Sequence, residues 1–117
     1  MRAPVLAIAT LAVGGSVALA SPALDVPVVV LTLKDHRFTP STITVPAGQR
    51  IRIDLTNRDA TADDFDSDDL HVDKELAPHG RVTFVIGPLR PGRYAFKGEL
   101  HAATAIGEVI AMAPPGP

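Results

Sequence analysis

Apolar and polar residues alternate along much of this chain. The pattern is cleanest over residues 51–57, where Ile51, Ile53 and Leu55 are separated by polar side chains. A period of two residues indicates a β-strand with one buried face. No segment of ten or more residues shows the 3.6-residue apolar period of a helix. The expected strands lie at residues 28–33, 38–45, 51–57, 82–86, 94–96 and 107–112.

Turn residues separate these segments and indicate how they are assembled. Pro46-Ala47-Gly48-Gln49, Pro78-His79-Gly80 and Leu89-Arg90-Pro91-Gly92 each carry the proline and glycine that tight turns favour. Six to eight short strands with turns between them predict an all-β sandwich or barrel. The residues expected in its core are Ile51, Ile53, Leu55, Val82, Phe84, Ile86, Tyr94, Phe96 and Met112.

The stretch from Arg58 to Pro78 interrupts the alternation and is acidic. Eight of the 13 acidic residues of the chain lie between Asp59 and Glu75. We expect this stretch to be a long connection and not a strand.

The first twenty residues have the composition of an export signal. Arg2 precedes an apolar run, and small residues follow up to an Ala18-Leu19-Ala20 cleavage site. We therefore expect a signal peptide over residues 1–20, a short lead over 21–27, one domain over 28–112 and a frayed tail over 113–117. An uncleaved anchor is the alternative, but prolines and glycines interrupt a run already too short to span a bilayer.

The net charge and the absence of cysteine exclude some functions for this chain. Removal of the leader takes one basic residue and leaves 10 basic against 13 acidic residues, a net charge of −3. Nucleic-acid-binding proteins usually carry an excess of positive charge, which this chain does not have. The chain has no cysteine, so it has neither disulfides nor a thiolate to offer a metal.

Two groups of motifs carry a family resemblance. Near the C-terminus the chain reads Tyr94-Ala95-Phe96-Lys97-Gly98-Glu99-Leu100-His101, and Gly107 opens the last strand. Upstream it has Phe38-x-Pro40, the turn Ile43-x-Val45-Pro46-x-Gly48, and Asn57 at the end of a strand. These motifs resemble those of cupredoxins over residues 28–112. The resemblance implies a Greek-key β-sandwich with a metal site at one end.

The departures from the cupredoxin pattern concern the metal ligands. Gly98 stands where that family has cysteine, Ala105 or Ile106 where it has methionine, and Asp64 near its first histidine; His101 is retained. A blue-copper site needs two histidines and one cysteine with a weak axial ligand. The chain therefore cannot be a blue-copper electron carrier.

A closer resemblance is to the small periplasmic cupredoxin-like proteins encoded with bacterial ferrous-iron permeases. It rests on Asp64-Phe65-Asp66, Leu70-His71-Val72-Asp73-Lys74-Glu75, Ile86-Gly87-Pro88-Leu89 and Gly98-Glu99-Leu100-His101. The resemblance implies a periplasmic protein that binds copper or iron, or both, and takes part in ferrous-iron uptake. Its partner would be an inner-membrane iron permease or another periplasmic iron-binding protein, with no nucleic acid and no spanning helix in the mature chain.

Residue chemistry supports a metal site with oxygen and nitrogen ligands. Imidazole binds copper and iron, and carboxylates bind harder ions such as ferric iron. An anionic, oxygen-rich site favours Fe(III) over Fe(II) and so favours oxidation. The candidate metal ligands are Asp64, Asp66, His71, Glu75, Glu99 and His101.

Three functions follow from these candidates and stay open. The first is a ferroxidase-type oxidoreductase or a protein that hands over Fe(II), the second a non-catalytic copper or iron carrier, and the third a metal-free interaction module. The candidates also have plainer interpretations, a solvated acidic surface for the acidic stretch and a loop histidine for His101. Outside the candidate ligands, His36 is either a group that supports the ligands or a surface residue, with the surface favoured, and His79 is a structural or exposed turn residue. The oligomeric state is open as well, with a homodimer among the alternatives because subunits can share acid-rich sites.

Overall fold

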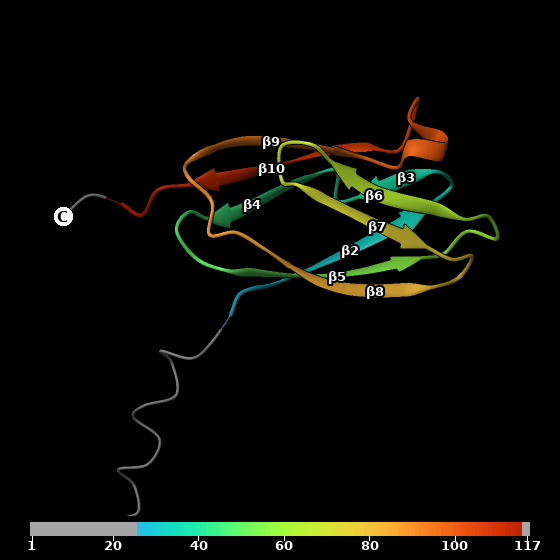
Figure 1. The fold of residues 1–117 in the computed structure, drawn as a ribbon, viewed down its shortest axis with the longest axis horizontal. Helices are drawn as coiled ribbons and strands as arrows, with labels where there is room; N and C mark the ends of the chain where they lie inside the picture. Colours follow the sequence, from blue (N-terminus) through green and yellow to red (C-terminus); the bar gives the residue numbers. More distant parts are fainter. Residues whose placement is uncertain (1–25, 116–117) are drawn as a thin grey trace, which may run out of the picture.

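The computed structural model describes residues 26–115, which form two packed β-sheets (Figure 1). The predicted signal peptide lies outside the described residues, as do most of the lead and the last two residues of the tail. The described residues form nine strands and one short 3₁₀ helix: β2 (Val28–Lys34), β3 (Arg37–Thr39), β4 (Thr42–Pro46), β5 (Ile51–Asn57), β6 (Asp63–Ser67), β7 (Val72–Leu76), β8 (Arg81–Ile86), β9 (Gly92–Lys97), η3 (Glu99–His101) and β10 (Ile106–Met112).

The two sheets have the mixed connections of a Greek-key sandwich. One sheet has the order β3-β2-β5-β8, and the other has the order β4-β10-β9-β6-β7. Strand β2 runs parallel to β5, and β10 runs parallel to β4, while the other pairs are antiparallel. The predicted all-β sandwich is confirmed. Across residues 26–115, no helix is long and apolar enough to cross a membrane.

The acidic stretch from residue 58 to 78 contains a β-hairpin, so the prediction of a strandless connection is wrong. Strands β6 and β7 pair in register, with Asp64 opposite Glu75 and Asp66 opposite Asp73. In β6, Asp63, Phe65 and Ser67 are buried, whereas Asp64 and Asp66 are only half-buried. The period of two is therefore present, but aspartate, a residue rare in strands, masks it in the sequence. This hairpin raises the strand count above the six to eight expected.

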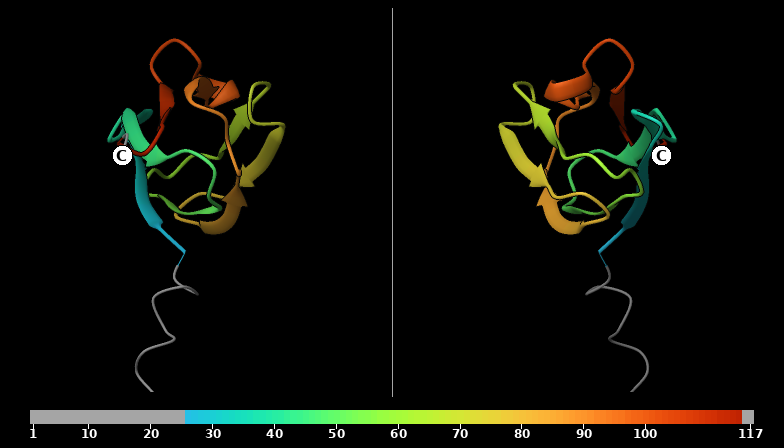
Figure 2. Two further views of the ribbon diagram at one scale, coloured as in Figure 1. Left: turned by 90° about the vertical axis from the view of Figure 1, so that its left-hand side faces the viewer. Right: turned by 90° about the vertical axis from the view of Figure 1, so that its right-hand side faces the viewer.

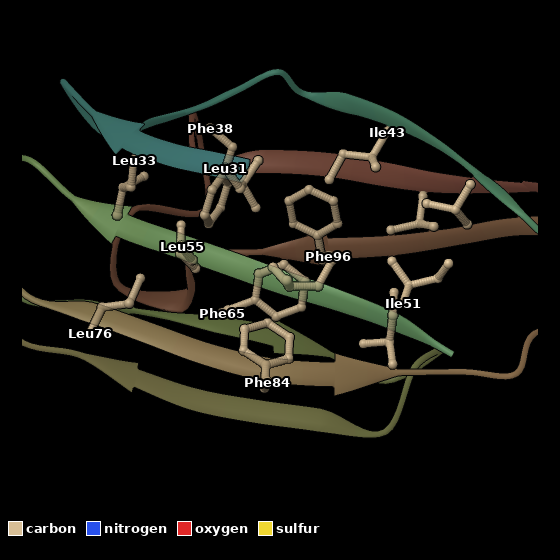
Figure 3. Close-up of a cluster of buried hydrophobic side chains, with 14 of the residues drawn as sticks. Leu31, Leu33, Phe38, Ile43, Ile51, Leu55, Phe65, Leu76, Phe84 and Phe96 are labelled. Atoms are coloured by element: carbon tan, nitrogen blue, oxygen red, sulfur yellow. The ribbon is translucent and has the colours of Figure 1, made fainter. Parts of the chain in front are cut away.

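The core lies between the sheets and is centred on four phenylalanines (Figure 3). Phe65 stacks on Phe96 with ring centroids 4.6 Å apart, and its centroid lies 5.0 Å from that of Phe84 and 6.1 Å from that of Phe38. The end-on views show the strands arranged around the middle of the domain (Figure 2). The core cluster takes side chains from both sheets. Phe65 comes from the hairpin that sequence analysis missed, so the hairpin contributes directly to the core.

Most of the predicted core is confirmed. Burial is complete or nearly so for Ile51, Ile53, Leu55, Phe84, Ile86 and Phe96. Val82 and Tyr94 are partly buried against the core, and the Tyr94 hydroxyl donates to the Arg90 carbonyl in the preceding turn. Met112 is 57% exposed, so its assignment to the core is wrong. Its neighbour Ala111 points inward, and alternation along β10 therefore turns Met112 outward.

Replacement of Phe65 by alanine tests the role of the hairpin in the core. Because Phe65 is fully buried among three other aromatic rings, Phe65→Ala is expected to lower the free energy of unfolding by about 3–5 kcal/mol. Urea unfolding of the two proteins measures the difference. Phe65→Leu retains most of the apolar volume and should lose less than half as much. Equal losses for the two variants would contradict the packing described.

Candidate functional site

Asn57 anchors the segment that leads from β5 to the candidate site. Its side chain is fully buried. The amide nitrogen donates to the carbonyls of Thr61 and Ala77, and the amide oxygen accepts the N–H of Asp59. These bonds satisfy the amide in the interior, as a buried polar group requires. They fix the path of residues 57–61 and so deliver Asp63 to the start of β6.

Asp63 joins β6 to the short helix η3. Its Oδ2 atom lies 2.8 Å from Nδ1 of His101. Its Oδ1 atom accepts the backbone N–H groups of Asp64 (2.8 Å) and Leu100 (3.2 Å). The Asp63 side chain is only 1% exposed, and that of His101 is 27% exposed. A buried carboxylate with three donors is well satisfied, and it holds the His101 ring in one orientation.

His36 stacks on one face of the His101 ring, whereas Asp63 bonds to a nitrogen at the edge of that ring. The two imidazoles stack with centroids 3.7 Å apart and an interplanar angle of 10°. Of the two interpretations of His36, this contact favours the group that supports the ligands, and the side chain is at the same time 41% exposed. Both Asp35 and His36 have positive φ angles, and their N–H groups donate to the Asp59 carboxylate. Sequence alone gives no sign of this contact, because the turn before β3 meets η3 only in the folded chain.

The Asp59 carboxylate organises that turn. Burial alone would raise the pKa of Asp59, but the N–H donors of His36 and Asp35 lower it below its usual value. Asp59 therefore stays ionised and faces the His36 ring, with its Oδ2 atom 3.5 Å from Nδ1. A carboxylate therefore lies near each histidine of the stack, but only His101 is hydrogen-bonded to its carboxylate, and Nδ1 of His36 has no hydrogen-bond partner.

Asp64 and Glu99 lie together at the same end of the sandwich. The Asp64 Oδ1 atom accepts the N–H of Glu99 at 2.6 Å. Burial raises the pKa of Asp64, and the charges of Asp63, Glu99 and Asp66 raise it further, although the Glu99 N–H opposes them. The local potential is therefore negative, and a cation near Asp64 would relieve it.

The remaining predicted ligands are spread along the hairpin. Glu75 is opposite Asp64 across the β6–β7 pair, and Asp66 is opposite Asp73 and Lys97. His71 has a positive φ angle in the β6–β7 turn, toward the other end of the sandwich from η3 (Figure 1). The four steps of β6 from Asp63 to Ser67 alone span roughly 13 Å. The structure thus places Asp64 against the backbone of Glu99 and opposite Glu75, whereas His101 contacts Asp63. His71 is separated from these residues by the length of β6.

Asp63 is the site residue that sequence reasoning missed. We expected Asp64 to approach His101, whereas the preceding residue does so. Side chains of consecutive strand residues point to opposite faces, so the two aspartates have different roles. The sequence did contain a clue to Asp63. It lies two residues before Phe65, and residues two apart in a strand point to the same, here buried, face.

The described residues do not fit the copper centre of a blue-copper protein. Gly98 offers no thiolate, and Asp63 and His101 bond directly to each other. In the same part of the chain, no group of three or more His, Cys, Asp or Glu residues is arranged to hold a metal ion. The stacked rings of His36 and His101 are parallel, so their nitrogen lone pairs cannot converge on one ion. Metal binding at this end would require side chains to rotate.

Comparison with known proteins agrees with the fold. The family model for the cupredoxin-like domain matches residues 5–111, and the chain belongs to this family. An uncharacterized protein of Rickettsia prowazekii (strain Madrid E) is 40% identical over 82 residues. This match covers 70% of the chain and 66% of the relative, so the chain spans just under two thirds of that protein's length.

Solved structures share the fold at low sequence identity. Auracyanin A, a "blue" copper protein from Chloroflexus aurantiacus, is 13% identical, with a TM-score of 0.65 over 75% of this chain and 100% of its own. The metal-binding domain of the Cu(I)-exporting ATPase CopA from Streptococcus pneumoniae D39, solved with Cu(I), is 10% identical. Its TM-score is also 0.65, over 73% of this chain and 84% of that domain. These likenesses establish the fold.

Neutralising Asp64 tests the electrostatics of the site. Asp64→Asn retains an oxygen for the Glu99 N–H and removes a charge that burial and three neighbouring carboxylates disfavour. We expect it to stabilise the protein at pH 7 by about 0.5 kcal/mol, in the range of like-charge pairs on a sheet. Thermal unfolding at low salt measures the change. A loss of stability would contradict the negative potential described.

Proposed function

We propose that this protein is a periplasmic carrier that binds ferrous iron through nitrogen and oxygen ligands and hands it to a membrane permease. The observation that carries the proposal is the bond between Asp63 and Nδ1 of His101. This bond makes Nε2 the ring nitrogen available to a metal ion. A carboxylate on the second nitrogen is the usual support of a metal-binding histidine, since it fixes the ring and raises its basicity.

The neighbouring carboxylates supply the oxygen ligands of the proposed site. Asp64 accepts the Glu99 N–H with one carboxylate oxygen and keeps the other for a cation. Glu99 is exposed, so its side chain can rotate toward His101. A site that assembles only on binding loses affinity to the ordering of its ligands. Weak binding suits a cargo that must be released.

The location and the partner rest on the sequence. The composition of residues 1–20 supports export, and the resemblance to proteins encoded with ferrous-iron permeases supports a permease as the recipient.

An anaerobic Fe(II) titration tests the carrier. His101→Asn keeps a nitrogen donor for Asp63 but removes Nε2, and His71→Asn makes the same change at the distant turn, where asparagine tolerates the positive φ angle. We expect His101→Asn to weaken Fe(II) binding at least about 10-fold, since loss of even an outer partner of a ligand weakens binding 10–100-fold. His71→Asn should bind as the wild type does. Equilibrium dialysis with iron analysis gives the dissociation constants.

Other outcomes of the titration point to the other functions. Equal binding by both variants would refute the proposed site. Faster Fe(II) loss in air with the wild-type protein, abolished by His101→Asn, would assign oxidation in place of carriage. Saturable copper binding without Fe(II) binding would assign a copper carrier. A complete lack of metal binding would favour the metal-free interaction module, which the direct Asp63–His101 bond also allows.

A further inference from the structure

Gly98 precedes η3 and lies beside Asp63. Its backbone has φ −94° and ψ 109°, an extended conformation open to any L-residue. Glycine is therefore not needed here for backbone freedom. The space around it is the constraint: a Cβ atom on residue 98 would lie 2.7 Å from Oδ2 of Asp63 and 2.8 Å from its Cγ and Oδ1. These distances are far inside van der Waals contact.

The Asp63 carboxylate cannot easily move away from that space. It is 1% exposed and bonded to His101 and to the N–H groups of Asp64 and Leu100. Rotation of the side chain would break these bonds and leave a buried charge without partners, which is strongly destabilising. Asp63 and Gly98 are therefore a matched pair, in which the carboxylate takes the volume that a side chain at position 98 would occupy.

We infer that Asp63 is the residue that determines the metal specificity of this site. Its carboxylate fills the place where a thiolate at position 98 would lie, and it also occupies Nδ1 of His101. Position 98 is thereby closed to any ligand, in a chain that has no thiolate elsewhere, and the site is limited to ions that accept Nε2 and carboxylate oxygens. The specificity rests on the proposed function, whereas the exclusion is steric and can be tested without any metal.

A double-mutant cycle between positions 63 and 98 tests the exclusion. Gly→Ala at a compatible extended position normally stabilises a protein by restricting the unfolded chain. With Asp63 present, we expect Gly98→Ala instead to lower Tm by about 5 °C or more. In the Asp63→Ala background, Gly98→Ala should leave Tm unchanged or raise it. The background Asp63→Asn keeps the volume without the charge and should retain the loss.

The cycle has a clear contrary result. If Gly98→Ala shifts Tm equally with Asp63 and with alanine at that position, Asp63 does not exclude a side chain at residue 98. Circular dichroism confirms that each variant is folded before its Tm is compared. This measurement is independent of iron, so a failed Fe(II) titration would refute the proposed function and leave the steric inference standing.

A second experiment tests the specificity with Co(II), a probe that does not oxidise thiols. Gly98→Cys alone should show no thiolate-to-cobalt absorption in the near ultraviolet above that of Ala95→Cys, an exposed thiol on β9. Asp63→Ala combined with Gly98→Cys removes the obstruction, frees Nδ1 of His101 and should show the band. An equal band from Gly98→Cys alone, or no band from the folded double variant, would overturn the assignment of specificity to Asp63.

Discussion

The buried carboxylate of Asp63 is the interaction on which this end of the protein depends. A buried charge is tolerated only when it is fully hydrogen-bonded, and Asp63 meets this condition with donors from Asp64, Leu100 and His101. The same bonds connect β6 to η3 and orient the His101 ring. They also hold the carboxylate where a Cβ atom on residue 98 would lie, so glycine is required at that position. A single side chain thus fixes the loop geometry, the available ring nitrogen and the space left for other ligands.

The chain has a cupredoxin-like fold and no thiolate at this end. The fold is similar to that of auracyanin A, with a TM-score of 0.65 over 75% of this chain. At the end of the sandwich, the described residues hold the loops together through Asn57, Asp59 and Asp63. Hydrogen bonds between protein groups therefore connect these loops directly.

The acidic hairpin links stability to the proposed function. Asp64 faces Glu75 across the strand pair and accepts the N–H of Glu99, and its pKa is raised by burial and by neighbouring carboxylates. Like charges in such proximity oppose folding, but they attract cations. Phe65, on the opposite face of the same strand, packs in the phenylalanine cluster and anchors the hairpin against this repulsion. One strand thus combines a core residue with an electrostatically unfavourable surface.

The sequence by itself determined the all-β class, most of the core and the absence of a thiolate, because alternation and composition are local properties. Tertiary structure decided that residues 63–76 form a hairpin, since packing of Phe65 outweighs the low strand propensity of its aspartate neighbours. It also decided that Asp63 and not Asp64 meets His101. A shift of one residue along a strand exchanges the buried and exposed faces, and 38 residues separate Asp63 from its partner, so only the packed sheets could select between them.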